Sequence, residues 1–485
     1  MPLCIGAQWG DVMPLGRRIA AALATATMVG AALLLPSPAF AESSTVTVGD
    51  FPRPVAISSD GTRGYAAIAV AGGGPGRLVE FDTATDQVLR ETAIQNEPLS
   101  LVFSPDETRA YVTGEVSGLI DVIDLESLTT VATWTVPPVA PGDNGRAQFL
   151  AVGPDGALYA SVRNQARVVR LDPVSGEVEV SFNTGSLPAG IAVGGGYLYV
   201  AVSVGQTVSR FDLAAPTTVS TIDVPTAPAT YYLALSPDGS QLWVSGYTST
   251  IVARVDTADF TTRFTVNLGA RVAGGVVAAD GARIYVPLEN ANAVAVLDTA
   301  DGSELGRVAV GADPRFIAFV PGTQWAWVSN VLGASLSLIG PPIPQAPTDV
   351  AAVEGEPVSF SAAARATADG FRWQRSDDGG ATWVDVPGGT DATLSFVATL
   401  ADDGALFRFV ASTELFGSAE SESALLTVSP APVPPAPCPG AQACPLPATG
   451  VDVAPLAAAV GGMLLAGGLL IAATRRRGIR SRARR

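Results

Sequence analysis

Between residues 45 and 340 the chain repeats one pattern of hydrophobic and polar positions about every 40–49 residues. Each repeat has a polar turn, then an aromatic residue in an alternating apolar segment, then a second alternating segment that ends in Asp. Alternation of this kind predicts strands, and the period leaves room for four short strands per repeat. The turns fall at 59–61, 104–106, 153–156, 194–196, 236–239, 279–281 and 320–322. The aromatic residues are Tyr65, Tyr111, Tyr159, Tyr199, Trp243, Tyr285 and Trp327.

The ends of the repeats predict how the strands are joined. The acids that end the second segments are Asp82, Asp124, Asp172, Asp212, Asp256 and Asp298. We expect each to accept a hydrogen bond from the backbone two residues on and to shape the next turn. The seventh repeat ends at Gly340 after its third strand, whereas residues 45–48 form a spare strand at the start. That strand can supply the missing outer strand and close a ring without an unpaired edge.

The repeat V-x-V-G-x-x-P…S-P-D-G…Y-V…V-x-V-I-D resembles the YVTN-type β-propeller repeat. The resemblance covers about 300 residues, with two departures: 194–196 lacks the Asp, and 137–148 is a longer entry loop. It implies an all-β protein with a seven-bladed β-propeller over residues 42–340. It implies almost nothing about activity, because one fold carries many functions.

A second all-β domain is expected after a Pro-rich linker at residues 341–347. Residues 348–429 resemble bacterial immunoglobulin-like domains in the segments 354–360, 373–383, 402–407 and 425–428. The resemblance implies a β-sandwich spacer with Trp373 as its buried core tryptophan. Asp377 and Asp378 have two interpretations, a calcium site or a tight hairpin turn, and the turn is favoured.

The C-terminal part resembles an LPXTG cell-wall sorting signal and follows an extended Pro-rich stalk at 430–445. The signal, residues 446–485, opens with Leu446, Pro447, Ala448, Thr449 and Gly450. The apolar run at 453–474 is long enough to cross a bilayer as a transmembrane helix, and the seven arginines after it favour the cytoplasmic side. The resemblance implies that a sortase cuts between Thr449 and Gly450 and joins Thr449 to peptidoglycan. The alternative is an ordinary single-span anchor.

The N-terminus predicts export. Two adjacent arginines precede an apolar run, and an A-x-A site predicts a signal peptide at 1–41 that is cut between Ala41 and Glu42. Poor flanks around the arginines favour the general secretory route over twin-arginine export, and translation starts at Met1 or Met13. The composition, rich in Ala, Gly and Arg, favours a high-GC Gram-positive source. The predicted location is therefore the cell wall.

Charge and composition argue against several functions. The predicted mature chain, residues 42–449, keeps 20 of the 29 arginines and 43 of the 45 acids, a net charge of about −23. Such a surface repels nucleic acid and anionic lipid, so membrane contact is expected only through the C-terminal helix before sorting. The sequence has neither histidine nor lysine, which removes the commonest general base and Schiff-base chemistry. No cofactor or metal is expected.

Two cysteines, Cys438 and Cys444, lie close together in the stalk. Outside the cell they are expected to form a small local disulfide loop. A metal site is the weaker interpretation, because two thiolates alone are too few ligands.

Candidate ligand residues gather where the loops of the ring converge on its channel. Four arginines are expected on the loops that enter the inner strands: Arg53, Arg146, Arg271 and Arg315. They could hold a carboxylate, a sulfate or a sialic-acid-like group by bidentate contacts, or pair with local acids, as Arg315 with Asp313. Three tyrosines are expected at the same end of one blade: Tyr231, Tyr232 and Tyr247. These could stack on a sugar ring or pack between blades.

Three functions are compatible with the sequence. The favoured one is a non-enzymatic, sortase-anchored surface protein whose head binds an extracellular glycan or protein. The second is a wall-anchored, metal-dependent propeller enzyme, lactonase-like or glycan-cleaving, and the missing histidine and lysine weigh against it. The third is a passive role in the cell envelope without a ligand.

Overall fold

The computed structural model describes residues 45–140, 145–225, 229–366 and 368–432. The predicted signal peptide with its cleavage site, the two cysteines of the stalk and the sorting signal with its apolar run lie outside these residues. Within the described part of the chain, no helix is long and apolar enough to cross a membrane.

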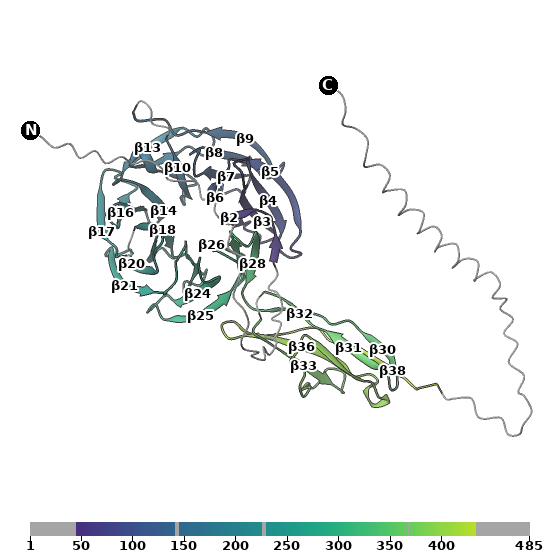
Figure 1. The fold of residues 1–485 in the computed structure, drawn as a ribbon. Coiled ribbons are helices and arrows are strands. Elements are labelled where there is room, and N and C mark those ends of the chain that lie inside the picture. The colour runs from purple at the N-terminus through teal and green to yellow at the C-terminus, as the bar shows by residue number, and fades with distance from the viewer. Residues whose placement is uncertain (1–44, 141–144, 226–228, 367, 433–485) are drawn as a thin grey trace, which may run out of the picture. The chain divides into compact units, whose positions relative to one another are not determined.

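Seven four-stranded antiparallel sheets form a ring in the described residues, each with its first strand towards the central opening (Figure 1). The first two sheets contain β2 (Phe51–Ile57), β3 (Arg63–Ala69), β4 (Gly76–Asp82) and β5 (Val88–Ile94), then β6 (Pro98–Phe103), β7 (Arg109–Gly114), β8 (Ile120–Asp124) and β9 (Thr129–Trp134). The next two contain β10 (Ala147–Val152), β11 (Leu158–Val162), β12 (Arg167–Leu171) and β13 (Val178–Asn183), then β14 (Pro188–Gly194), β15 (Tyr197–Val202), β16 (Thr207–Asp212) and β17 (Val219–Asp223). The last three contain β18 (Thr230–Leu235), β19 (Gln241–Gly246), β20 (Ile251–Asp256) and β21 (Thr261–Asn267), then β22 (Val276–Val277), β23 (Arg283–Leu288), β24 (Ala293–Asp298) and β25 (Glu304–Ala309), then β26 (Pro314–Phe319), β27 (Ala326–Asn330), β28 (Ser335–Ile339) and β1 (Thr45–Thr47).

The predicted closure of the ring is confirmed. The N-terminal strand β1 pairs antiparallel with β28 and becomes the outer strand of the seventh sheet, with Thr45 opposite Ser337 and Val46 opposite Leu336. The first and last repeats therefore share one sheet, and the ladder hydrogen bonds that would otherwise be exposed at an edge are made.

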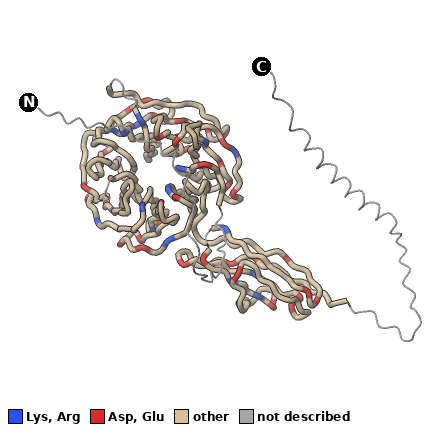
Figure 2. Tube along the Cα trace, in the orientation of Figure 1, with Lys and Arg blue, Asp and Glu red and all other residues tan. Residues whose placement is uncertain are grey.

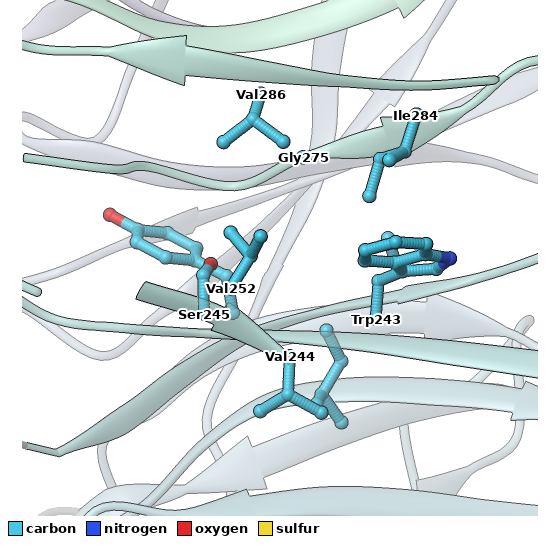
Figure 3. A pocket seen from close by; sticks show the side chains of 10 residues that line it. Trp243, Val244, Ser245, Val252, Gly275, Ile284 and Val286 are labelled. Carbon is cyan, nitrogen blue, oxygen red and sulfur yellow. The ribbon is translucent and has the colours of Figure 1, made fainter. Parts of the chain in front are cut away.

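Neighbouring sheets pack face to face through apolar side chains. Between the fifth and sixth sheets, Trp243 and Val252 face Ile284 and Val286 across the interface (Figure 3). The cavity that remains there is about 10 Å³, the space of one water at most. This gap is therefore core packing and leaves no room for a ligand.

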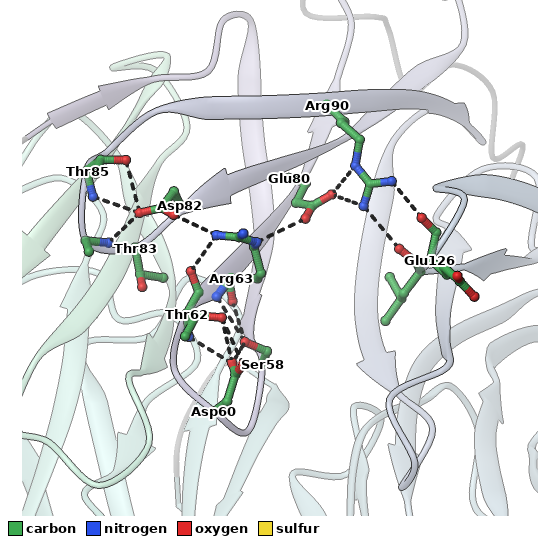
Figure 4. A network of polar contacts seen from close by, with 12 residues as sticks. Ser58, Asp60, Thr62, Arg63, Glu80, Asp82, Thr83, Thr85, Arg90 and Glu126 are labelled. Carbon is green, nitrogen blue, oxygen red and sulfur yellow. Dashed lines mark hydrogen bonds and ion pairs between the residues drawn. The ribbon is translucent and has the colours of Figure 1, made fainter.

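Carboxylates stabilise the turns of the repeat, which lie where each first strand ends and each third strand ends (Figure 4). Asp60 accepts hydrogen bonds from Ser58 Oγ at 2.6 Å and from the backbone of Thr62 at 2.9 Å, and these bonds lower its pKa. Asp82 accepts from the backbone of Thr85 at 2.9 Å and pairs with Arg63 at 2.6 Å, and its pKa is lowered as well. The same carboxylate-to-backbone bonds recur at Asp124, Asp172, Asp212, Asp256 and Asp298. The predicted turn-shaping role of these acids is confirmed.

A further mixed β region follows the ring. It comprises β29 (Ile343–Gln345), β30 (Val350–Val353), β31 (Pro357–Ser361), β32 (Ala363–Arg365), β33 (Gly370–Ser376), β34 (Val384–Asp385), β35 (Thr393–Val397), β36 (Leu406–Thr413), β37 (Gly417–Glu420) and β38 (Ala424–Ser429). β30 pairs with β38 in parallel, and the six-stranded sheet that holds them shares one core with the pair β31–β35. Trp373 is fully buried there between Phe360 and Phe409, as predicted. Asp378 accepts hydrogen bonds from Thr382 and Ser376, the contacts of a turn.

The described residues up to Pro430 belong to one compact unit, and several contacts join the further β region to the ring. Residues of the Pro-rich segment form β29, which pairs with β32. Trp325 Nε1 in the seventh sheet donates to the carbonyl of Pro341 at 2.8 Å. Arg365 forms an ion pair with Asp86 and donates to the carbonyl of Thr83 at 2.8 Å.

Candidate functional site

Each inner strand of the ring begins at the same end of its sheet, and six of the seven inner strands of the described structure carry a register shift near that end. In β26 the shift leaves Arg315 between Pro314, which pairs with Asn330, and Phe316, which pairs with Ser329. The six strands with the shift are β2, β6, β10, β14, β18 and β26. A bulge of this kind redirects a side chain and is common beside functional sites. The residues at this position are Arg53, Leu99, Gln148, Ala189, Tyr231 and Arg315.

The loops between the second and third strands reach the same end of the ring. In six of the seven blades, the first residue of this loop donates its backbone N–H to the carbonyl of a residue that leads into an inner strand, at 2.8–3.2 Å. These pairs are Glu115 with Glu97, Arg163 with Arg146, Ser203 with Leu187, Tyr247 with Ala229, Glu289 with Arg271 and Val331 with Asp313. Entry residues, bulge residues and loop residues together define a surface that we call the mouth.

The mouth contains six of the seven residues that the sequence singled out, and the seventh, Tyr232, directly follows the bulge residue Tyr231 in β18. Arg53 and Arg315 occupy equivalent bulges, as their spacing predicted. Arg146 and Arg271 are entry residues. Figure 2 shows basic and acidic positions along the inner side of the ring as well as on its rim. Apart from Asp313, the sequence did not predict the acids that lie among them, nor the fifth arginine, Arg163.

On one side of the mouth, Arg53 bridges two glutamates of the second sheet. It pairs with Glu97 and, at 2.9 Å, with Glu115. Arg146 donates to the backbone carbonyl of Glu115, also at 2.9 Å. Arg163 lies 5.8 Å from the ring centre of Tyr231, within the range of a cation–π contact.

On the other side, Arg271 pairs with Glu289 at 2.8 Å and Arg315 pairs with Asp313 at 3.1 Å. Glu289 is only 6% exposed, and burial raises its pKa while the charges of Arg315 and Arg271 oppose that change. The alternative considered for Arg315, pairing with Asp313, is what the structure contains. Each arginine named by the sequence therefore has a polar contact within the mouth.

The tyrosines form one cluster with unequal exposure. Tyr231 lies 4.9 Å from Tyr232 and 5.2 Å from Tyr247, measured between ring centres. Tyr231 and Tyr232 are buried and also contact Phe149, whereas Tyr247 is 49% exposed. Burial raises the pKa of Tyr231 to about 12 and that of Tyr232 further. All three hydroxyls are neutral at physiological pH, and of the three tyrosines only Tyr247 is substantially exposed to solvent.

Below the mouth, the central channel contains a cavity of about 340 Å³. Residues from the inner part of all seven sheets line it, and most of them are apolar, including Val55, Leu101, Leu150, Ile191 and Phe316. Two glycines approach the tyrosines closely, and the first has no room for a side chain. A Cβ at Gly190 would lie 2.5 Å from the carbonyl oxygen of Tyr231, and one at Gly274 would lie 3.2 Å from the ring of Tyr232.

Comparison with solved structures identifies the ring. Hydrazine synthase from Kuenenia stuttgartiensis aligns with 61% of this chain and 96% of its own, at 16% identity and a TM-score of 0.51. The β-propeller domain of Cps50 (Swd1) from Myceliophteria thermophila aligns with 62% of this chain and 98% of its own, at 14% identity and a TM-score of 0.51. The ring is a β-propeller. Its seven sheets are its blades.

Virginiamycin B lyase from Staphylococcus aureus aligns over a similar span, 62% of this chain and 98% of its own, at 15% identity and a TM-score of 0.49. At these identities the likeness concerns the fold and does not extend to activity. No protein-family model matches the sequence, and neither does any curated protein.

Sequence reasoning missed four charged residues of the propeller mouth: Glu97, Glu115, Arg163 and Glu289. Three of these directly follow the second strand of a blade, the position that Tyr247 holds in the fifth blade. Aligning the repeats at that position would have found them. Glu97 enters the inner strand of its blade with φ at +54°, a backbone conformation shared by Leu187 and Asp313 at the same position.

Proposed function

We propose that this protein is a sortase-anchored surface protein of a Gram-positive cell wall, whose propeller head binds an extracellular ligand. The observation that carries the ligand-binding part is the mouth. Charged and aromatic side chains of six blades gather at one end of the channel, and the corresponding positions of the fourth blade are Leu187, Ala189 and Ser203. A surface built only to close the ring would need no such set of polar groups.

The other parts of the proposal concern display of the head. Residues 348–429 act as an immunoglobulin-like spacer, which the shared core of β31–β35 and the larger sheet supports. Residues 430–445 act as a stalk across the wall, and Thr449 is the residue joined to peptidoglycan. A head held at a fixed distance from the cell surface suits contact with a ligand outside the cell.

A thermal-shift screen of residues 42–437 tests ligand binding. This fragment contains the described part of the compact unit that ends at Pro430. The panel comprises neutral and acidic sugars, glycosaminoglycan and wall fragments, lactones and divalent metals. A ligand at a hundred times its Kd stabilises the folded state by about 2.7 kcal/mol, so a shift in Tm is easily measured.

Variants of the mouth separate specific binding from binding elsewhere. Arg53→Ala and Arg315→Ala are expected to abolish the shift, because each removes a donor and unpairs the acids beside it. Arg263→Ala is the matched control: this arginine pairs with Asp256 and Asp259 at the opposite end of the fifth blade. A shift that survives both mouth variants would reject the mouth as the binding site, and no shift with any probe would favour a passive role.

A further inference from the structure

The mouth is divided into a charged arc and an uncharged arc. The charged arc runs through the first, second, third, sixth and seventh blades and holds the five arginines and four acids described above. The uncharged arc lies on the fourth and fifth blades and contains Leu187, Ala189, Ser203, Tyr231 and Tyr247. A ligand seated across the mouth would therefore meet charged hydrogen-bonding groups on one side and a tyrosine with an apolar surround on the other.

The charged arc is nearly neutral as a whole. Arg53, Arg271 and Arg315 are each paired with acids, so five positive charges stand against four negative ones. A mouth made for a polyanion would instead leave its arginines without carboxylates beside them, because each carboxylate repels the ligand. Paired guanidinium and carboxylate groups offer a dense array of donors and acceptors with little net field.

Several polar atoms of the charged arc have no hydrogen-bond partner within the described part of the chain. They are Nε of Arg53, Arg146 and Arg271, Nη1 of Arg163, Oε1 of Gln148 and Oε2 of Glu289. Gln148 is only 4% exposed and occupies the bulge of β10, the place that Arg53 and Arg315 occupy in their strands. Glu289 Oε2 is held by the ion pair with Arg271 at 2.8 Å, without hydrogen-bond geometry to any described residue. Buried polar atoms normally have partners, so the described residues leave this arc incompletely paired. These atoms are themselves enclosed, and the groups that a ligand's hydroxyls can reach are the partly exposed side chains, such as Glu97, Glu115 and Arg271 at 36%, 38% and 41% exposed.

We propose that the mouth binds an uncharged sugar ring of an extracellular glycan. This inference rests on the proposed function and specifies its ligand. The C–H face of the ring stacks on the exposed face of Tyr247, and the hydroxyl groups point across the mouth to the charged arc. Vicinal hydroxyls both donate and accept, which suits neighbouring guanidinium and carboxylate groups. The hydroxyl of Tyr231, which is protonated at physiological pH, is a further donor on the fifth blade.

Binding of matched neutral and acidic sugars to residues 42–437 tests the inference by calorimetry. The neutral probes are oligosaccharides of glucose, galactose, mannose and N-acetylglucosamine, and the acidic probes are galacturonate oligomers, sialylated and sulfated oligosaccharides. We expect a neutral probe to bind and its affinity to change little between low and high salt, because no net charge is neutralised. Tyr247→Ala should weaken binding about tenfold, since it removes the stacking surface.

Two control variants keep the test specific. Tyr247→Phe retains the ring and should bind within about threefold of the natural protein. Val204→Ala removes another exposed apolar side chain from a loop at the same end of the fourth blade and should leave the affinity unchanged. Because Tyr247 is half exposed, its replacement should not disturb folding, and an unchanged Tm without ligand verifies this.

The remaining outcomes separate this inference from the proposed function. Binding of acidic probes alone, or neutral binding that Tyr247→Ala leaves intact, would overturn the inference while the head remained a binding domain. Failure of every sugar would also overturn it. The proposed function would then stand only if another member of the wider panel, tested with the Arg53 and Arg315 variants, still bound at the mouth.

Discussion

Val46 in the first strand of the ring lies opposite Leu336, near the end of the seventh repeat. Val46 is 3% exposed and belongs to a core that also contains Val55, Phe81 and Trp327. The side chain that closes the ring is thus also part of the packing between the seventh and first blades. Closure combines ladder hydrogen bonds with apolar burial.

Val46→Asp should therefore destabilise the propeller strongly. A carboxylate at this position has no partner and loses its hydration, and we expect a loss of about 3 kcal/mol in the free energy of unfolding. Urea unfolding of residues 42–437 measures it. Thr45→Asp is the matched control, because Thr45 is the exposed neighbour on the same strand, and its effect should stay within about 0.5 kcal/mol. Equal losses in the two variants would show that burial of Val46 does not matter for closure.

A second prediction concerns the ion pair between Arg365 and Asp86, which joins the further β region to the ring. Both side chains are largely buried, and Arg365 also donates to Thr83 O. Arg365→Ala should therefore lower the free energy of unfolding by about 1–3 kcal/mol. In differential scanning calorimetry of this variant, the further β region should melt at a lower temperature than the propeller.

Arg372→Ala is the control for this experiment. Arg372 lies in the same region and pairs with Asp385 at 3.3 Å, but both side chains are more than half exposed. An exposed pair contributes little, so Tm should hardly change. If the two variants behaved alike, the contact with Asp86 would not hold the region to the ring.

Local patterns in the sequence predicted much of the fold, because each depends on residues close together in the chain. The strands, the turn acids and the burial of Trp373 follow from alternation, short hydrogen bonds and one large apolar side chain. The closing strand could also be predicted, since the seventh repeat lacks one strand and the N-terminus has one to spare.

The charge balance of the mouth could not be predicted in the same way. Arg53 meets Glu97 and Glu115 across the boundary between two blades, and that contact depends on how neighbouring blades align. Spacing within one repeat says nothing about this alignment. The Pro-rich segment at 341–347 was expected as a linker, and its strand β29 depends on a partner, β32, that lies further along the chain.

The turn acids predict a response to low pH. Hydrogen bonds from Ser236 Oγ and from the backbone and hydroxyl of Ser240 lower the pKa of Asp238 to about 2, against an ordinary value of 3.8. Between these values the unfolded chain binds more protons than the folded one. The contribution of the Asp238 carboxylate to the free energy of unfolding is therefore present above pH 3.8 and is lost as the pH falls towards 2. Asp238→Asn should therefore be less stable than the natural protein at pH 5, and the gap should narrow between pH 4 and pH 2.

Denaturant unfolding at several pH values measures that gap. The control is Asp280→Asn in the equivalent turn of the sixth blade, where Ala278 and Ala282 replace the two serines and Asp280 accepts from the backbone of Ala282. With no hydroxyl donors in that turn, the control should have the smaller effect at pH 5. A gap for Asp238→Asn that stays constant down to pH 2 would contradict the role of its carboxylate charge.

The proposed anchoring makes the last prediction. In a Gram-positive host that expresses a sortase, digestion of the wall with a muramidase should release the natural protein attached to peptidoglycan fragments. Thr449→Ala removes the residue whose carbonyl would form the link, so the chain should instead stay in the membrane fraction and keep its basic tail. Ala448→Gly, at the variable position of the motif, should still be linked to the wall. If the natural protein itself remained in the membrane fraction with its tail intact, residues 453–474 would be an ordinary membrane anchor, and the head would be displayed from the membrane instead of the wall.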